Sequence, residues 1–281
     1  MHRRPFMERP GRTSAPNENR GEVMTAQPTA VITGAARGIG AAVVRRLRAD
    51  GWNVVAVDLC DDDPAVPYPL GTADELRTLA EDGDGITVLT GDVRERAVLD
   101  TAVQQALDQH GRLDAAIGAA AVILGGRPLW ETTDEQWDTL FDIDVRGLLN
   151  LARAAVPAML PARQGRFVAL ASAAAHHGLW HLGAYCAAKH AVLGLVRGMA
   201  ADLKGSGVSA VAVSPGSTRT DMLRATAALY QLDDVQSLGA HQLVDRLLEP
   251  EEVAAAVAWA SSPDASAFNG TVLHADGGFT G

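Results

Sequence analysis

The chain has 281 residues, of which 47% are hydrophobic and 21% are charged, and its formal net charge is −10. This composition is ordinary for a globular protein, and the negative charge argues against nucleic acid or an anionic membrane as a partner. Only two cysteines occur, Cys60 and Cys186, which excludes a disulfide framework and favours a reducing, cytoplasmic setting. The longest uncharged apolar run, 115–126, is too short to cross a bilayer as a helix.

The N-terminal segment differs in composition from the rest of the chain. Residues 1–26 are polar and rich in arginine and proline, without the apolar stretch of a signal peptide. We expect a disordered tail there, and Met24 offers an alternative start. No repeat or linker interrupts residues 27–281, which are predicted to form one domain.

Strand-like and helix-like segments alternate along that domain. Apolar, β-branched runs predict strands at 29–34, 52–60, 85–93, 113–124, 165–172, 208–216 and 270–278. Amphipathic runs predict helices at 41–50, from Thr72, at 95–111, from Thr133 to about Leu160, and at 184–207. Strands that alternate with helices are typical of a parallel sheet. We therefore expect an α/β fold with a Rossmann-type, doubly wound parallel sheet and helices on both faces.

A glycine-rich turn follows the first predicted strand. The stretch TGAARGIG places Gly34, Gly38 and Gly40 between a strand and a helix. Glycines there let the backbone approach a pyrophosphate, which the N–H groups at the helix N-terminus then bind. Asp58 ends the second predicted strand, where its carboxylate can accept hydrogen bonds from the adenosine ribose and would repel a 2′-phosphate. These features predict an NAD site, although Arg37 could reach a phosphate and keeps NADP as an alternative.

A long polar segment separates the second predicted strand from the third. Residues 59–85 contain three aspartates and three prolines before a helical pattern starts at Thr72. A connection of this length in a compact domain is usually either functional or disordered. Its position directly after Asp58, beside the expected cofactor, favours a functional loop. Asp92, at the end of the third predicted strand, would border the adenine or, equally well, cap a helix.

Ser172, Tyr185 and Lys189 form a candidate catalytic group. Tyr185 and Lys189 are spaced i, i+4, so they share one face of a predicted helix, and Lys189 is one of only two lysines in the chain. Ser172 ends a predicted strand at the carboxyl edge of the sheet, where α/β proteins bind ligands. Hydride transfer between nicotinamide and an alcohol carbon also moves the hydroxyl proton. We predict Tyr185 as the acid/base, Lys189 as the group that lowers its pKa, and Ser172 as the residue that orients the substrate oxygen.

These motifs together resemble the short-chain dehydrogenase/reductase family. TGAARGIG, Ser172, YCAAK and PGSTRT match its pattern over residues 28–281. The resemblance implies Ser-Tyr-Lys catalysis and places Thr218 near the nicotinamide amide. The expected cofactor contacts are Gly34, Arg37, Gly38, Ile39, Gly40, Asp58, Leu59, Asp92, Val93, Ala119, Ala120, Tyr185, Lys189, Pro215, Gly216 and Thr218. One departure is the sequence Gly-Ala-Ala-Ala at 118–121, where the family has Asn-Asn-Ala-Gly, so side chains that usually brace the cofactor region are absent.

A second departure concerns Asp144. Thr133 and Gln136 form a capping box that starts a helix, and Asp144 lies in the apolar stripe of that helix, at the position of the family's catalytic asparagine. A buried charge needs a partner. One interpretation is a partly exposed acid beside Arg146 or a neighbouring subunit. The other places Asp144 near Lys189 through a water molecule and makes it a fourth catalytic residue in the proton relay.

A closer resemblance is to the subfamily associated with mycofactocin, a peptide-derived redox carrier. It rests on VDLCDDDPAVPYPL, GGRPLWE, SAAAHHGLWHLGAYCAAKH and LLEPEEVAAAVAW. The resemblance implies that NAD stays tightly bound and that mycofactocin takes the electrons, with the loop after Asp58 as a lid over the adenosine half. The alternatives are a conventional dehydrogenase that exchanges NAD(H) freely and a non-catalytic dinucleotide sensor.

Three histidines lie between Ser172 and Tyr185, in a loop that must border the reaction centre. They are His176, His177 and His181. No acidic ligand or cysteine accompanies them, and hydride transfer by this group needs no metal, so no metal site is expected. Packing or helix capping explains individual histidines, but we expect a pocket role for at least one of them, together with Trp180.

The segment 221–248 interrupts the last helix–strand unit, where the family carries its variable substrate lid. Met222, Leu223, Leu229 and Tyr230 suggest an apolar pocket, although ordinary helix packing explains them equally well. The predicted substrate contacts are His177, Trp180 and Met222. They would bind a small alcohol or ketone whose identity the sequence leaves open.

A homotetramer is expected by analogy with the family alone. Alanine-rich helix faces at 148–158 and 187–201 are compatible with contacts between subunits. The same faces would pack equally well inside one subunit.

Overall fold

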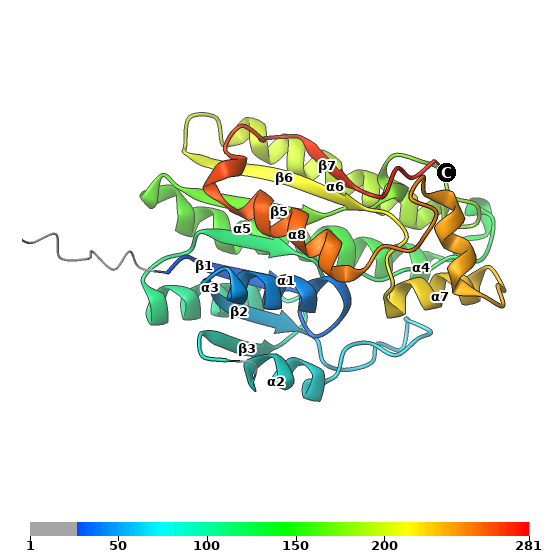
Figure 1. The fold of residues 1–281 in the computed structure, drawn as a ribbon, viewed down its shortest axis with the longest axis horizontal. Coiled ribbons are helices and arrows are strands. Elements are labelled where there is room, and N and C mark those ends of the chain that lie inside the picture. The colour runs from blue at the N-terminus through cyan, green and yellow to red at the C-terminus, as the bar shows by residue number, and fades with distance from the viewer. Residues whose placement is uncertain (1–26, 82, 281) are drawn as a thin grey trace, which may run out of the picture.

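The computed structural model describes residues 27–81 and 83–280, so the predicted tail 1–26 and the alternative start at Met24 lie outside the described residues. Within them, seven parallel strands form one sheet in the order β3-β2-β1-β4-β5-β6-β7 (Figure 1). The strands are β1 Thr29–Thr33, β2 Asn53–Asp58, β3 Ile86–Thr90, β4 Ala115–Gly118, β5 Gly165–Leu170, β6 Val208–Pro215 and β7 Val272–Ala275. The direction of strand order reverses between β1 and β4, which is the switch point of a doubly wound sheet and confirms the predicted fold class.

Helices cover both faces of this sheet (Figure 1). They are α1 Gly38–Ala49, α2 Ala73–Glu81, α3 Arg96–His110, α4 Asp134–Leu140, α5 Gly147–Met159, α6 Gly183–Asp202, α7 Asp221–Leu229 and α8 Pro250–Ser261. One buried cluster packs α1, α2 and α8 against the sheet, and a second packs α3, α5 and α6 against its opposite face. Because both faces are covered, a central strand such as β6 is buried at every position, which explains its continuous run of small and apolar residues.

The fourth strand ends earlier than predicted. β4 stops at Gly118 rather than Leu124. Beyond it, Val122 and Ile123 donate their backbone N–H groups to side chains and not to a neighbouring strand. The chain after Gly118 therefore leaves the sheet and lines the space above its carboxyl edge.

The predicted helix from Thr133 to about Leu160 forms with a change of hydrogen-bonding pattern in its middle. Its capping box is present, because Thr133 and Gln136 each accept the other's backbone N–H in a side-chain oxygen. α4 is followed by a π-helical turn, Phe141–Arg146, before α5 continues. Such turns are frequent at functional sites, and this one contains Asp144.

Candidate active site

A cavity of about 720 Å³ opens at the carboxyl ends of the central strands. Parallel α/β sheets bind their ligands at this edge. The cavity is lined by residues from every predicted cofactor motif, namely Gly34, Arg37, Gly38, Ile39, Gly40, Asp58, Leu59, Asp92, Val93, Ala119, Ala120, Pro215, Gly216 and Thr218. Ser172, Tyr185 and Lys189 line the same cavity, so one space brings the two predicted groups together.

The glycine turn fits the phosphates of a dinucleotide. Gly34 has a positive φ of 68°, and a side chain on Gly40 would collide with the Gly34 carbonyl oxygen. Arg37 is the N-cap of α1 but makes no side-chain capping bond, and no acidic residue lies in the first turn of that helix. No acidic side chain within the first turn of α1 therefore competes for the N–H groups of that helical turn, as pyrophosphate binding requires.

Asp58 and Arg37 bear on the choice between NAD and NADP. The Ala36 N–H donates to Asp58 Oδ2 at 2.9 Å, which fixes the carboxylate at the cavity wall. Arg37 forms an ion pair with Asp221 at 3.5 Å and donates to the Pro69 carbonyl oxygen. The Arg37 charge is thus matched by an acid, while the Asp58 carboxylate would repel a 2′-phosphate. The arrangement favours NAD.

The predicted catalytic group comes from two elements. Ser172 follows β5, and its Oγ accepts the Ala174 N–H at 3.1 Å. Tyr185 and Lys189 lie on α6, with Lys189 Nζ 5.6 Å from the centre of the Tyr185 ring. A hydrogen bond joins the Ser172 and Tyr185 side chains. The three side chains therefore converge on one part of the cavity, as acid/base catalysis on a single substrate oxygen requires.

Asp144 is 2% exposed and pairs directly with Lys189. Its Oδ2 lies 3.0 Å from Lys189 Nζ, and its Oδ1 accepts the Val122 N–H at 2.9 Å. Both interpretations from the sequence need correction. The contact with Lys189 is direct and does not run through a water molecule, and Arg146 pairs with Asp142 instead, at 2.9 Å.

Burial is the largest influence on the protonation of these groups. It raises the pKa of Tyr185, against the opposing effects of the Lys189 ammonium and the Ser172 hydrogen bond. It also raises the pKa of Asp144, although Lys189 and the Val122 N–H favour the carboxylate. Burial alone would lower the pKa of Lys189, but the Asp144 carboxylate and Tyr185 raise it, so the lysine stays charged. The predicted lowering of the Tyr185 pKa by Lys189 is present and is outweighed by burial.

Each of the three loop histidines has a hydrogen-bonding or packing partner. His176 Nε2 lies 2.9 Å from the Oγ of Ser214, a buried residue of β6. Burial and the neighbouring cationic groups lower the pKa of His176, which keeps it neutral. His181 stacks on Trp180 with ring centres 3.5 Å apart.

The predicted substrate contacts are only partly brought together. Trp180 and Met222 line the cavity. His177 is not among the residues that line the cavity, and its contact with substrate stays a prediction. Its ring lies 5.6 Å from that of Phe279, which does line the cavity, so His177 packs behind the wall rather than in it.

Several cavity residues come from distant parts of the chain and carry little readable signal in the sequence. They are Tyr68, Leu70, Gly71, Leu182, Leu238, His241 and Phe279. For Tyr68, the sequence offers one indication of a role, which is an aromatic residue between two prolines in the loop after β2. Its partner, 55 residues further along the chain, depends on the tertiary fold.

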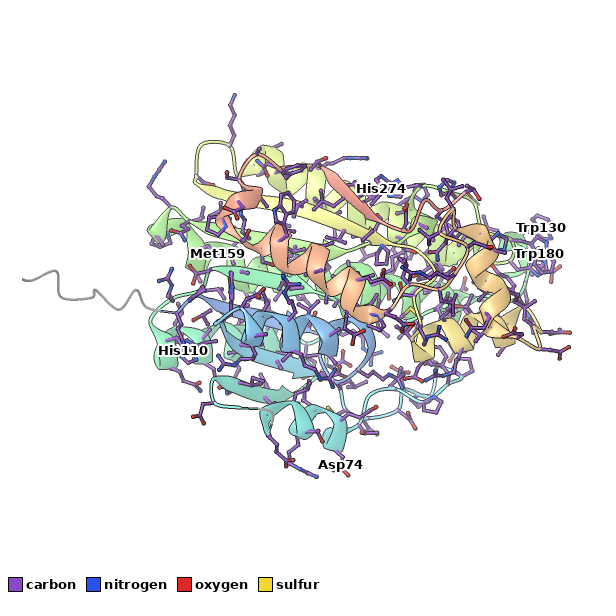
Figure 2. The ribbon with its side chains drawn as sticks, in the orientation of Figure 1. Asp74, His110, Trp130, Met159, Trp180 and His274 are labelled. Carbon is purple, nitrogen blue, oxygen red and sulfur yellow. The ribbon has the colours of Figure 1, made fainter. Side chains whose placement is uncertain are left out.

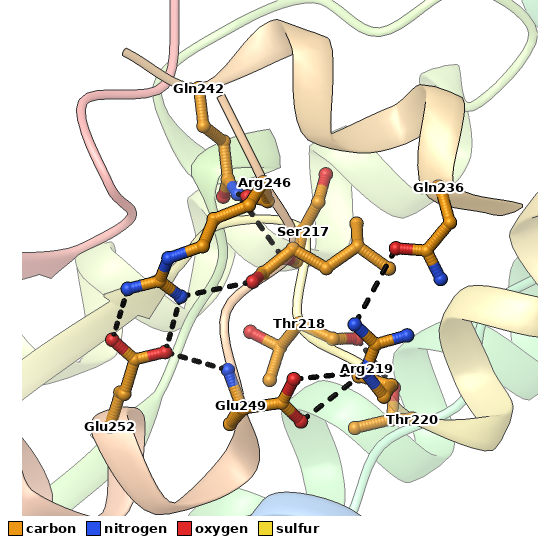
Figure 3. A network of polar contacts seen from close by, with 10 residues as sticks. Ser217, Thr218, Arg219, Thr220, Gln236, Gln242, Arg246, Glu249 and Glu252 are labelled. Carbon is orange, nitrogen blue, oxygen red and sulfur yellow. Dashed lines mark hydrogen bonds and ion pairs between the residues drawn. The ribbon is translucent and has the colours of Figure 1, made fainter. Parts of the chain in front are cut away.

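Polar contacts tie the predicted substrate lid to the body of the protein (Figure 3). Arg219 donates to Glu249 at 2.9 Å and to Gln236 at 3.4 Å. Arg246 pairs with Glu252, in the first turn of α8, at 2.7 Å. The lid residues that line the cavity are Met222, Leu223, Thr226, Tyr230, Leu232, Leu238 and His241.

Exposed aromatic side chains mark the same end of the molecule. Trp180 lines the cavity and is 69% exposed. Figure 2 shows Trp180 and Trp130 at the end that carries the lid, and Trp130 is 85% exposed. The entrance of the cavity is therefore partly apolar.

Residues 27–81 and 83–280 contain no group of three or more His, Cys, Asp or Glu side chains that could hold a metal ion. In the same part of the chain, no helix has both the length and the apolar character needed to span a membrane. Cys60 and Cys186 are both free thiols.

Known proteins resemble this chain over nearly its whole length. A family model described as Enoyl-(Acyl carrier protein) reductase matches residues 34–280. An uncharacterized oxidoreductase of Mycobacterium tuberculosis is 37% identical, covering 89% of this chain and 95% of that protein. (-)-trans-Carveol dehydrogenase of Rhodococcus erythropolis is 31% identical, covering 89% of this chain and 96% of that protein.

Among solved structures, carveol dehydrogenase from Mycobacterium avium in complex with NAD superimposes with a TM-score of 0.85, at 30% identity. The alignment covers 90% of this chain and 97% of that one. Sequence and fold thus agree over about nine-tenths of the chain. The chain belongs to the short-chain dehydrogenase/reductase family, and it is an NAD-dependent alcohol dehydrogenase/reductase of that family.

Proposed function

We propose that the protein interconverts a primary or secondary alcohol and its carbonyl compound, using tightly bound NAD that is reoxidised by mycofactocin. The observation that carries the alcohol chemistry is the convergence of Ser172, Tyr185 and Lys189 on the cavity that contains the glycine turn. NAD, when bound, supplies the hydride acceptor for oxidation and the hydride donor for reduction.

The protein's own groups move the proton. In alcohol oxidation, Ser172 and Tyr185 bind the substrate oxygen, and the Tyr185 phenolate accepts the hydroxyl proton as the hydride leaves the carbon. The Lys189 ammonium stabilises that phenolate. In carbonyl reduction, the Tyr185 hydroxyl returns the proton to the oxygen. Buried apolar residues such as Ile143 and Leu182 line the cavity in which this exchange takes place.

Asp144 acts through Lys189 and is a positioning residue. The carboxylate holds the ammonium in place, and it raises the pKa of Lys189 where burial alone would lower it. Its negative charge also raises the pKa of Tyr185. An asparagine at this position would supply the hydrogen bond without the charge, so Asp144 shifts the pH range in which the phenolate forms.

Tight binding of NAD is supported by contacts that cross the cavity. Arg37 joins the long loop after β2, at Pro69, to the start of the lid helix, at Asp221. Both segments also line the cavity, at Leu70 and Met222 for example. A bridge between two segments that line the cavity would slow the release of a dinucleotide bound there. The resemblance to the mycofactocin subfamily supplies the external acceptor; the alternative is free exchange of NAD(H) with solvent.

The substrate end favours an apolar alcohol. The lining of the cavity contains Leu182, Met222, Leu223 and Leu238 in addition to Ser172. The relatives named carveol dehydrogenase act, by their names, on a cyclic secondary alcohol. Carveol is therefore the first compound to test, together with a series of primary and secondary alcohols.

We place the enzyme in the cytoplasm as a homotetramer, with residues 221–248 as its substrate lid and 59–85 as a loop over the cofactor. A non-catalytic sensor is the alternative of another class. It is disfavoured because a sensor has no need of the intact Ser-Tyr-Lys group.

The decisive experiment measures nicotinamide in the purified protein. After exhaustive desalting, the protein is denatured and the extract is assayed for NAD. Near-stoichiometric NAD, with carveol oxidation only when an artificial electron acceptor is added, is the expected result. An empty site that reduces added NAD in solution contradicts the mycofactocin coupling and leaves a conventional dehydrogenase.

A further inference from the structure

Tyr68 extends from the long loop after β2 to the end of β4. Its hydroxyl oxygen accepts the Ile123 N–H at 2.8 Å. The side chain lines the cavity and packs against the same apolar core as Val66, which is 6% exposed. A tyrosine in a loop rich in aspartate and proline therefore serves as the contact between that loop and the backbone beside the active site.

Val122, the residue before Ile123, contacts the buried ion pair of Asp144 and Lys189. Val122 donates its N–H to Asp144 Oδ1 at 2.9 Å, and Asp144 Oδ2 lies 3.0 Å from Lys189 Nζ. Two consecutive amides thus bind two side chains, one from the loop and one from the catalytic centre. The two amides belong to adjacent planar peptide units that are joined at Val122 Cα, so a displacement of the Ile123 amide reaches the Val122 amide through only the two backbone dihedrals of Val122.

Other contacts seat the loop in one position. The side chain of Asp63 is 8% exposed, and its Oδ2 lies 2.8 Å from Nη2 of Arg94. Arg94 also pairs with Asp92 at the end of β3. On the far side of the loop, Arg37 donates to the Pro69 carbonyl oxygen. Tyr68 lies between these two anchors in the chain and supplies the link to β4.

Opening of the loop would leave the Ile123 N–H without its acceptor. A buried amide without a partner is unfavourable, so the segment after β4 would rearrange to satisfy it. The geometry points to Tyr68 as a positioning residue that couples closure of loop 59–72 over the cavity to the alignment of Asp144 and Lys189. This inference rests on the proposed function. It adds that Asp144 and Lys189 have their full effect on the pKa of Tyr185 only while the loop is closed.

The electrostatic surroundings of Tyr68 suit this role. The titratable and charged groups that face it are Asp144, Tyr185 and Arg37, and Asp144 in turn faces Lys189. Burial raises the pKa of Tyr68, so the side chain remains a neutral phenol in the working pH range. The oxygen of a neutral phenol can accept the Ile123 N–H, and it adds no charge beside the Asp144 carboxylate.

The test uses Tyr68→Phe, which retains the ring and removes the hydroxyl. The holoenzyme, with NAD added in excess if the purified protein lacks it, is mixed with carveol, and reduction of the nicotinamide is followed in single turnovers across pH. We expect the midpoint of the pH–rate profile to move to lower pH by about half a unit, because Asp144 no longer raises the pKa of Tyr185 to its full extent. NAD dissociation is expected to accelerate by about five- to tenfold.

Tyr230→Phe is the matched control. It also removes a hydroxyl from the cavity wall, but that hydroxyl donates to the carbonyl oxygen of Trp180, in the loop between Ser172 and Tyr185. We expect it to change the KM for carveol and to leave the pH midpoint unchanged. Melting temperatures of both variants establish that each is folded.

A double variant separates coupling from independent effects. In the Asp144→Asn background, Tyr68→Phe should move the pH midpoint no further, because the group it acts through has lost its charge. An unchanged midpoint in Tyr68→Phe, even with faster NAD release, overturns the proposal, as do fully additive shifts in the double variant. Failure of the proposed function looks different: Tyr185→Phe would then turn over carveol like the parent.

Discussion

Two ion pairs in this molecule have similar geometry and opposite surroundings. Lys189 and Asp144 are 3.0 Å apart, with side chains 3% and 0% exposed. Arg246 and Glu252, at the base of the lid, are 2.7 Å apart and 53% and 43% exposed (Figure 3). Water screens the second pair and replaces either partner when it is lost, whereas nothing replaces a partner of the first. Distance alone therefore does not indicate what an ion pair contributes.

The largest effect is expected at the group that the buried pair serves. Tyr185→Phe removes the hydroxyl that carries the proton and retains the ring. We expect kcat to fall by about 10²- to 10⁴-fold, the usual contribution of general acid/base catalysis, with NAD binding retained. Steady-state oxidation of carveol with an artificial acceptor, together with the NAD content of the variant, measures both. Turnover like that of the parent would remove Tyr185 from the mechanism and favour a sensor.

The second effect concerns stability and compares the two pairs directly. Lys189→Met leaves the Asp144 carboxylate buried without its partner, and we expect the free energy of unfolding to fall by about 3–5 kcal/mol. Arg246→Met, the exposed counterpart, should lower the free energy of unfolding far less, because water replaces the lost partner of Glu252. Urea denaturation measures both differences.

The double variant Lys189→Met/Asp144→Leu is the control for that comparison. Replacing both charges by apolar groups removes the unpaired carboxylate, so most of the lost stability should return. A double variant that is no more stable than Lys189→Met would mean that packing, and not the buried charge, causes the loss.

The third effect is a change of pH dependence. The Asp144 charge raises the pKa of Tyr185, so Asp144→Asn should lower it. Alcohol oxidation requires the phenolate and its rate rises with pH through this pKa, so the rise should move to lower pH, by about one unit, while activity is kept. The pH profile of kcat measures the shift. If Asp144→Ala matches the parent at every pH, Asp144 has no part in the proton relay.

The smallest effect belongs to the exposed pair. Hydrogen bonds from Arg246 and from the Glu249 N–H lower the pKa of Glu252 to about 2. A carboxyl with a lowered pKa stabilises the folded state above its ordinary value of 4.5, and this contribution is lost as the pH falls towards 2. Melting temperatures of the parent and Glu252→Gln should therefore differ slightly at neutral pH and converge in acid. A difference that persists at the lowest pH would show that the charge of Glu252 is not the cause.

Much of the architecture could be predicted because it depends on local pattern. The alternation of strands and helices, the Thr133 capping box and the i, i+4 spacing of Tyr185 and Lys189 are properties of short segments, and the structure contains all of them. The length of β4 could not be predicted. Apolar residues continue to Leu124, but the amides of Val122 and Ile123 are taken by side chains that arrive from elsewhere.

In the candidate active site, too, the features that depend on local pattern could be predicted and the tertiary contacts could not. The glycine turn and Asp58 could be placed from sequence because each lies at the carboxyl end of a strand, and parallel strands end at one edge of the sheet. The direct partner of Asp144 and the position of His177 behind Phe279 could not. Both depend on side-chain directions that a π-helical turn and a distant C-terminal segment fix.

By itself, the sequence determined the fold class, the order of the elements and the identity of the residues available for hydride chemistry, because these follow from periodicity and from the end of each strand. Only the tertiary structure decided which of these residues touch. It buried Asp144 against Lys189 and brought Tyr68 to Ile123, 55 residues away, since such contacts arise when separate elements pack and exclude water. The contacts that tune the chemistry are therefore properties of the packed molecule and of no single segment.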